Sequence, residues 1–184
     1  MCIELDPNEI LSREFEYAAQ TAFQAHEDRV RVFNYYLATA GTLVATVVVV
    51  DLTNSTSLLA VFSLLFTGLA ILGFGSFLQL IKLRLAWTDS VRAMCQIKEY
   101  YIRTCDEPEL TEAFRWKMET IPSTGKKWTV AFLMALTTAL LSSACACCTV
   151  LLWGLAATGS PWGIQGALAG LSSLAAQLAV WLCL

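Results

Sequence analysis

The sequence predicts an all-α membrane protein with four transmembrane helices in two hairpins, an amphipathic N-terminal helix and a central cytoplasmic helical hairpin. Hydrophobic residues make up 57% of the 184 residues and charged residues only 15%, whereas soluble domains carry about 25% charged residues. Asp51 is the only charged residue between positions 32 and 81, and residues 128–184 carry none. Nine of the twelve Lys and Arg residues lie in the intervening segment 82–127.

The apolar stretches are expected to be helices. A helix needs about 20 apolar residues to cross a hydrocarbon layer of about 30 Å, and lipid offers no partners for backbone polar groups, so each span must satisfy them internally. Long Ala, Leu and Val runs replace the alternation of polar and apolar residues that is typical of a transmembrane barrel. We therefore expect helical spans.

Residues 1–32 are expected to form a cytoplasmic amphipathic helix that continues into the first span. Asp6 suits the N-cap, Pro7 the first turn and Glu9 the capping box. One face is apolar and rich in small residues, and its members are Leu11, Phe15, Ala18, Ala22 and Ala25. This face packs on neighbouring helices of the same chain or contacts another subunit or protein.

Residues 33–81 are expected to form the first transmembrane hairpin, with spans at about 33–50 and 58–81 and a turn at 51–57 that contains no cation. Basic and aromatic residues gather where spans meet water. The residues expected at the membrane boundary are Arg29, Arg31, Tyr35, Tyr36, Lys82, Arg84, Lys126, Lys127 and Trp128.

Residues 82–127 are expected to form a cytoplasmic helical hairpin. The helix of the second span continues to about Thr104, where Glu99 and Arg103 can pair at i,i+4. A second capping box at 106–109 predicts a short helix to about Thr120. Their apolar stripes predict an interface with each other, with other copies or with a soluble partner. Its residues are Leu83, Trp87, Val91, Met94, Ile97, Tyr101, Leu110, Phe114 and Met118.

Residues 128–184 are too long for one crossing, and the break at 158–163 predicts a second transmembrane hairpin. The third span runs from Trp128 to about Trp153 and the fourth from about Ile164 to Leu184. The fourth carries a small and polar stripe made of Gly163, Gly166, Gly170, Ser173 and Gln177. Such stripes allow close helix contact, either within the bundle or at a subunit interface or pore wall.

The distribution of charge predicts the orientation. Both short loops lack Lys and Arg, so the positive-inside rule places the N-terminus, the C-terminus and the central segment in the cytoplasm. The expected immediate surroundings are the lipid bilayer.

Several functional classes have little support in the sequence. No ionisable residue lies at the expected membrane depth, which argues against proton-coupled transporters, pumps and intramembrane hydrolases. No nucleophile, base and acid set is visible, so we do not expect an enzyme. The single His26 and the position of the Cys145, Cys147 and Cys148 cluster deep in apolar sequence predict no metal site and no cofactor. No basic stripe with interleaved aromatics indicates nucleic-acid binding.

The layout of residues 10–104 resembles a known class of proteins. Arg29-Val-Arg31 precedes the first hairpin and Lys82-Leu-Arg84 follows it, with an amphipathic helix before and a charged helix after. This layout is similar to the SLATT-type small transmembrane effectors of bacterial nucleotide-signalling defence systems, with residues 128–184 as an additional hairpin. The resemblance implies a homo-oligomer in the bacterial inner membrane that perturbs this membrane when a cytoplasmic signal arrives.

Two functional hypotheses follow. The first is an oligomeric pore-forming or membrane-perturbing effector that is gated through its cytoplasmic helices. The alternative is a non-catalytic membrane anchor or accessory subunit that docks a soluble partner on the helices at 83–121. In the first hypothesis the protein acts on the membrane itself, and in the second it holds a soluble partner at the membrane.

Overall fold

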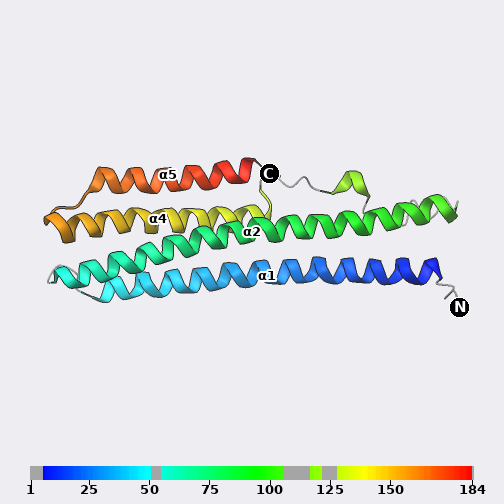
Figure 1. Ribbon diagram of the computed structural model, residues 1–184, viewed down its shortest axis with the longest axis horizontal. Coiled ribbons are helices and arrows are strands. Elements are labelled where there is room, and N and C mark those ends of the chain that lie inside the picture. Colours follow the sequence, from blue (N-terminus) through cyan, green and yellow to red (C-terminus); the bar gives the residue numbers. More distant parts are fainter. Residues whose placement is uncertain (1–5, 51–54, 106–116, 122–127, 184) are drawn as a thin grey trace, which may run out of the picture. The chain divides into compact units, whose positions relative to one another are not determined.

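The computed structural model describes residues 6–50, 55–105, 117–121 and 128–183. In this part of the chain there are four α-helices and no strands: α1 (Pro7–Val49), α2 (Thr56–Cys105), α4 (Val130–Thr158) and α5 (Gly163–Leu182) (Figure 1). All four are long and apolar enough to cross a membrane. The predicted all-α fold with four candidate spans is confirmed, and the protein is an integral membrane protein.

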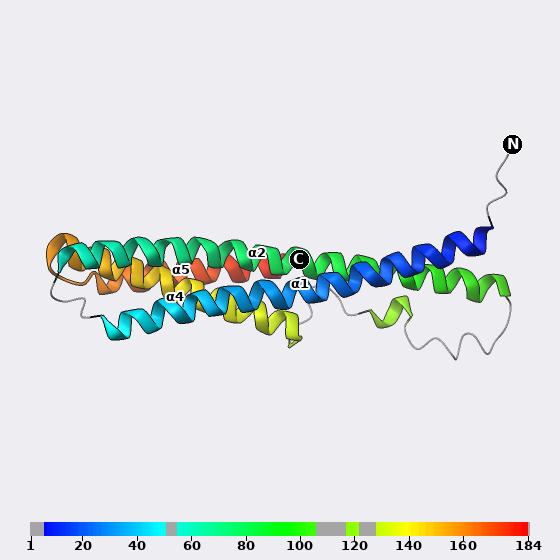
Figure 2. The same ribbon diagram turned by 90° about the horizontal axis from the view of Figure 1, so that it is seen from below.

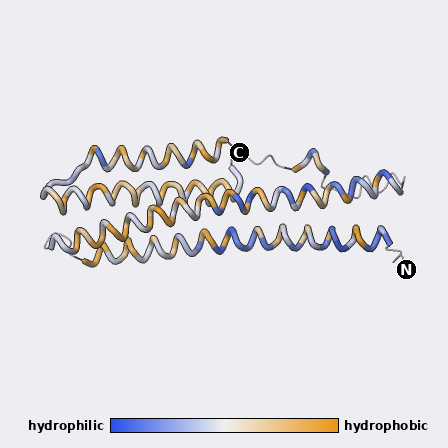
Figure 3. The backbone as a smooth tube through the Cα atoms, in the orientation of Figure 1, coloured by the Kyte–Doolittle hydropathy of each residue, from blue (hydrophilic) through white to orange (hydrophobic). Residues whose placement is uncertain are grey.

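The chain divides into two compact units. The charged unit comprises Met1–Arg29 and Lys82–Lys126, and the apolar unit comprises Val30–Ile81 and Lys127–Leu184. Both α1 and α2 contribute one part to each unit. Figure 3 shows the corresponding change of hydropathy along these two helices, while α4 and α5 are predominantly apolar.

Helix α1 begins as the sequence suggests, with a different role for Glu9. The Asp6 carboxylate accepts a hydrogen bond from the backbone N–H of Asn8 at 2.9 Å, which caps the helix. The Glu9 carboxylate, expected to complete the capping box, accepts a bond from Arg13 at 2.8 Å. No Gly or Pro lies between residues 8 and 40, and the helix continues through Gly41 to Val49.

Within the charged unit, α1 and α2 pair in antiparallel fashion. The Lys98 ammonium lies 5.7 Å from the centre of the Phe15 ring, which brings the start of α1 to the end of α2. The buried positions on the two helices recur in mirrored steps of four, three and four. The positions with this spacing are Ala18, Ala22, Ala25 and Arg29 on α1, and Cys95, Val91, Thr88 and Arg84 on α2, where Ser90 and Ile97 are also buried.

We call these eight residues the alanine seam. Alanine lacks the bulk that would separate two helix backbones, so the sequence allows close packing here. The predicted face of α1 is buried at Ala18, Ala22 and Ala25, while Leu11 and Phe15 at its start are half-buried. Towards the end of α2, Arg103 pairs with Glu99 at 3.8 Å as expected.

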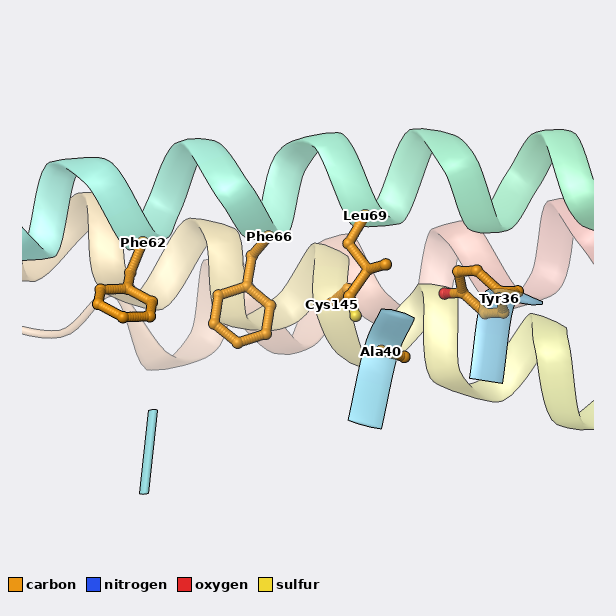
Figure 4. Close-up of a cluster of buried hydrophobic side chains, with 6 residues drawn as sticks. All are labelled: Tyr36, Ala40, Phe62, Phe66, Leu69 and Cys145. Carbon is orange, nitrogen blue, oxygen red and sulfur yellow. The ribbon is translucent and has the colours of Figure 1, made fainter. Parts of the chain in front are cut away.

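The apolar unit contains a core shared by three helices. Figure 4 shows Tyr36 and Ala40 of α1 next to Phe62, Phe66 and Leu69 of α2 and Cys145 of α4. Helices α4 and α5 lie side by side as an antiparallel hairpin (Figures 1 and 2). Gly159 ends α4 with a φ of 72°, a left-handed conformation that glycine adopts without a side-chain clash.

The outer surface of the apolar unit is strongly apolar. Large side chains on all four helices face outward, among them Val48 at 82%, Leu64 at 70% and Ile164 at 78% exposure. Water-soluble proteins rarely expose contiguous patches of this kind. Only 11% of the most apolar stretch of α1 is buried, so lipid or other protein must cover most of this span.

The largest differences from the expected elements lie after α2. Residues 106–116, including Leu110, Phe114 and the second capping box, lie outside the described residues. Met118–Thr120 forms a 3₁₀ turn instead of the end of an α-helix. Trp128 precedes α4 with a φ of 64°, and Thr129 caps the helix by accepting a bond from the Phe132 N–H at 3.2 Å.

The alanine seam predicts a specific sensitivity to side-chain volume. Ala22→Leu should lower the free energy of unfolding by about 1–3 kcal/mol, because the added methylene groups have no space between α1 and α2. Hydrogen–deuterium exchange of residues 7–29 in the detergent-solubilised protein measures the effect. Gln20→Leu, at an exposed position of the same helix, is the matched control. Equal protection in both variants would show that the seam is not closely packed.

Candidate functional site

Residues of all four helices are linked by contacts around Gly73 and Ser142 in the apolar unit. A Cβ placed on Gly73 of α2 would overlap the Tyr36 hydroxyl of α1 and lie 2.5 Å from Ser142 Cβ of α4. Gln177 of α5 in turn bonds to Ser142. We call Tyr36, Gly73, Ser142 and Gln177 the polar junction. Glycine at position 73 lets the backbone of α2 approach the other helices at this point.

Gln177 is the most constrained member of the polar junction. It is fully buried, at 0% exposure. Its Nε2 donates to Ser142 Oγ at 2.8 Å and to Ser173 Oγ at 3.2 Å. Hydrogen bonds between transmembrane helices contribute about 0.6–2 kcal/mol each. The amide therefore connects α5 to α4 at a fixed register.

Two oxygens of the polar junction remain without a nitrogen or oxygen partner among the described residues. They are Tyr36 Oη and Gln177 Oε1, and both are buried. The Cys145 thiol lies near the Tyr36 hydroxyl, but sulfur is a weak hydrogen-bond partner. An unsatisfied buried polar group costs about 1–3 kcal/mol, so this packing of the helices is not the best that these groups could achieve.

A second polar contact joins α2 to α4. The Ser63 hydroxyl donates to the backbone carbonyl of Thr149 at 3.2 Å, and Thr67 Oγ1 lies 3.5 Å from Thr149 Oγ1. Most other hydroxyl groups in the spans bond to the carbonyl one turn earlier in their own helix, as Thr138 does to Met134 at 2.9 Å. Such local bonds give the hydroxyl groups an acceptor, because lipid offers no hydrogen-bond partner.

The predicted small and polar stripe of α5 lies largely against α4. A Cβ on Gly166 would lie 3.1 Å from the Cys147 carbonyl oxygen, and one on Gly170 would lie 3.1 Å from that of Ser143. Ser173 is half-buried and bonded to Gln177, and Gly163 is exposed. Gly166 and Gly170 therefore pack closely against α4, and a role of the stripe at a subunit interface or pore wall stays a prediction.

The cysteine cluster of α4 is divided between the core and the helix surfaces. Cys145 is buried in the apolar core, while Cys147 and Cys148 are partly buried. In the described parts of the chain no three His, Cys, Asp or Glu side chains are placed to hold a metal ion.

The predicted cytoplasmic interface is partly turned inward. Val91 and Ile97 are buried. The remaining described members are half-buried: Leu83, Trp87, Met94, Tyr101 and Met118. Aromatic side chains that the sequence analysis did not single out are more exposed, namely Tyr17 at 66%, Phe23 at 64% and Tyr100 at 48%.

The predicted boundary residues occupy different environments. Tyr35 and Trp128 are 69% and 84% exposed, whereas Tyr36 is 4% exposed and belongs to the core. Arg31 and Lys82 are exposed, and Lys126 and Lys127 lie outside the described residues.

Arg29 and Arg84 are buried. Burial lowers the pKa of Arg29, and burial together with the charge of Arg29 lowers the pKa of Arg84. Both remain cationic because arginine is not deprotonated in proteins.

The helical spacing of the small and polar stripe identified Gln177. The sequence did not reveal that Gln177 belongs to a polar junction with residues of the other three helices. Tyr36 looked like an interfacial aromatic, and Gly73 was one of several glycines in an apolar span. A polar or small residue inside each span was the only available signal. Which of these residues meet depends on the packing of four helices, which their local sequence does not encode.

Comparison with models of known protein families, with curated proteins and with solved structures gives no match. The polar junction supplies a phenol, a hydroxyl and a carboxamide, and these groups act through hydrogen bonding.

Gly73→Ala should destabilise the apolar unit by about 1–3 kcal/mol, because the new methyl group overlaps the Tyr36 hydroxyl and Ser142. Thermal unfolding in detergent, followed by circular dichroism, measures the change. Gly75→Ala on the same helix is the control, since a Cβ there meets nothing within 4 Å. It should leave stability unchanged or raise it by up to about 1 kcal/mol. Equal midpoints for the two variants would contradict the close approach at Gly73.

Proposed function

We propose that this protein is a homo-oligomeric membrane effector whose charged unit receives a cytoplasmic signal and whose apolar units then perturb or open the membrane. The observation that carries the proposal is the continuity of α1 and α2, each of which belongs to both units without a break. The SLATT-like layout of the sequence is compatible with the same activity.

Continuous helices provide a mechanical connection from the charged unit to the polar junction. Hydrogen bonds between successive turns make an α-helix stiff along its axis. Arg29 in the alanine seam lies seven residues before Tyr36, and Gly73 lies eleven residues before Arg84. These separations correspond to about 10 Å and about 16 Å of helix. A shift or rotation of either helix in the seam therefore alters the contacts of Tyr36 and Gly73.

The unsatisfied groups of the polar junction support a second arrangement of the helices. Tyr36 can donate a hydrogen bond and Gln177 Oε1 can accept one, and neither atom has a nitrogen or oxygen partner in the described chain. A rearrangement that pairs them, or that admits water to them, would recover part of the cost of their burial. A signal that favours this arrangement shifts the population of the two states.

The surface of α1 supports the oligomeric part of the proposal. A groove of about 540 Å³ runs between α1 and α2 and is lined by Ala38, Thr39, Thr42, Leu43, Thr46, Phe62 and Leu65. The hydroxyl groups of Thr39, Thr42 and Thr46 already bond within α1 at 2.8 Å. Small and hydroxyl-bearing faces are typical contact surfaces between transmembrane helices, so we propose that copies meet along this face.

The orientation belongs to the same proposal. The positive-inside rule places both termini and residues 82–127 in the cytoplasm, and the resemblance indicates the bacterial inner membrane. In this orientation the charged unit meets soluble signals and the short loops face outward.

A membrane anchor that docks a soluble partner on residues 83–121 is the second candidate function. The exposed ring of Tyr100 favours it, while the burial of Val91 and Ile97 removes part of the apolar face that docking would use. We prefer the effector because it uses the continuity of α1 and α2, which an anchor does not require.

Thr42→Trp should reduce the number of subunits per particle, because the indole ring fills the groove beside α1. Mass photometry of the protein in lipid nanodiscs measures the subunit number, and dye release from liposomes measures membrane perturbation. Val44→Trp is the control, since Val44 is 50% exposed and lies about 200° around the same helix from Thr42. It should behave as the unmodified protein.

Two outcomes would count against the proposal. An unmodified protein that is monomeric in nanodiscs would remove the oligomer. An oligomer that releases no dye, with cytoplasmic extract as the trigger, would favour the anchor function.

A further inference from the structure

A second pocket lies between residues 32–39 of α1 and residues 69–79 of α2, and we call it the boundary pocket. It adjoins the groove of the proposed subunit contact and shares only Thr39 with the lining of that groove. Its volume is about 230 Å³. The share of liquid volume of one water molecule is about 30 Å³, so the boundary pocket has room for several groups of that size.

The boundary pocket runs from the edge of the expected spans into the hydrocarbon. Val32 lies one residue before the expected start of the first span, and Gln79 lies two residues before the expected end of the second. Thr39 lies seven residues after Val32, and Leu69 lies ten residues before Gln79. These separations correspond to about 10 Å and about 15 Å of helix. Half of a hydrocarbon core of about 30 Å is about 15 Å, so the pocket extends through the depth of one leaflet.

Polar side chains line the outer end of the boundary pocket. They are the exposed Tyr35 and Gln79 and the half-buried Ser76. Their phenol, carboxamide and hydroxyl groups can all donate hydrogen bonds. Among the described residues that line the pocket, none is Lys, Arg, Asp or Glu. The outer end therefore offers hydrogen bonds without a net charge.

The inner end of the boundary pocket is apolar. Leu69 and Leu72 line it. The Thr39 hydroxyl already donates to the Tyr35 carbonyl at 2.8 Å, and the Tyr36 hydroxyl lies at the polar junction beside Gly73. A matching ligand therefore has uncharged hydrogen-bond acceptors at the edge of the hydrocarbon and an apolar part below them.

We propose that the boundary pocket binds the glycerol ester region of a diacyl phospholipid. The ester carbonyl groups of such a lipid accept hydrogen bonds and lie where the acyl chains join the polar region, which is the level of Ser76 and Gln79. One acyl chain then lies against Leu69 and Leu72. The pocket recognises the ester linkage and not the headgroup, because its lining carries no charge. This site is independent of the proposed effector function, since it requires neither an oligomer nor a signal.

Native mass spectrometry of the full chain, released from detergent with one lipid at a time, tests the site. The probes are dipalmitoyl phosphatidylcholine, which has ester linkages, and dihexadecyl phosphatidylcholine, which has ether linkages and chains of the same length. We expect the protein to retain the ester lipid about threefold to tenfold more strongly, which is the effect of about one net hydrogen bond. Equal retention of the two lipids by the unmodified protein would overturn the proposal.

Gln79→Leu removes a donor from the outer end of the pocket and should reduce the preference for the ester lipid. Gln165→Leu, at an exposed position of α5 outside the pocket lining, is the matched control and should keep the preference. The same preference in both variants would show that the ester is recognised elsewhere.

Ser76→Trp tests the position of the lipid by volume. The indole ring fills the boundary pocket, so this variant should lose the retention of both lipids. Ile71→Trp on the same helix is the control, since Ile71 is 68% exposed and does not line the pocket. Equal retention by the two Trp variants would overturn the site. A lower subunit number in Ser76→Trp with unchanged lipid retention would identify a second copy of the chain as the occupant and overturn the lipid. If Ser76→Trp does not fold, the comparison at the exposed Gln79 decides.

Discussion

The exclusion of charge from hydrocarbon is the constraint on which the rest of this structure depends. A charged side chain at the centre of a bilayer costs about 2.5–3.5 kcal/mol on insertion scales. All twelve Lys and Arg residues accordingly lie before residue 32 or within 82–127. The same separation divides the folded chain into a charged unit and an apolar unit, and it requires α1 and α2 to be amphipathic in one part and apolar in the other.

Each unit solves the packing of its helices by different chemistry. In the charged unit, small side chains bring α1 and α2 together and the apolar face is buried between them. In the apolar unit, lipid is as apolar as the helices, so small residues and hydrogen bonds must provide the specificity. Gly73 is such a small residue, and the bond from Gln177 to Ser142 at 2.8 Å is such a hydrogen bond. The same junction leaves Tyr36 Oη and Gln177 Oε1 without a nitrogen or oxygen partner among the described residues. For this reason we propose that the helices rearrange at the polar junction when the signal arrives.

Features of this fold were predictable where the sequence of a single helix determines them. Composition predicts the four spans, and the absence of Gly and Pro between residues 8 and 40 predicts that α1 runs into the first span. The 3- and 4-residue spacing predicts the buried Ala18, Ala22 and Ala25. The site depends on contacts between helices and was not predictable in the same way. Tyr36, Arg29 and Arg84 were all expected at the membrane boundary, and all three are buried. The burial of Tyr36 follows from neighbours on α2 and α4, which are distant in sequence.

The sidedness of single cysteines tests the account most directly. In a chain whose native cysteines are replaced, a membrane-impermeant maleimide is applied to intact cells carrying either Ser160→Cys or Gln96→Cys, both exposed positions. The account predicts that position 160 reacts in intact cells and position 96 reacts only after the membrane is permeabilised. Reaction of both positions from the same side would contradict four crossings with the charged unit in the cytoplasm.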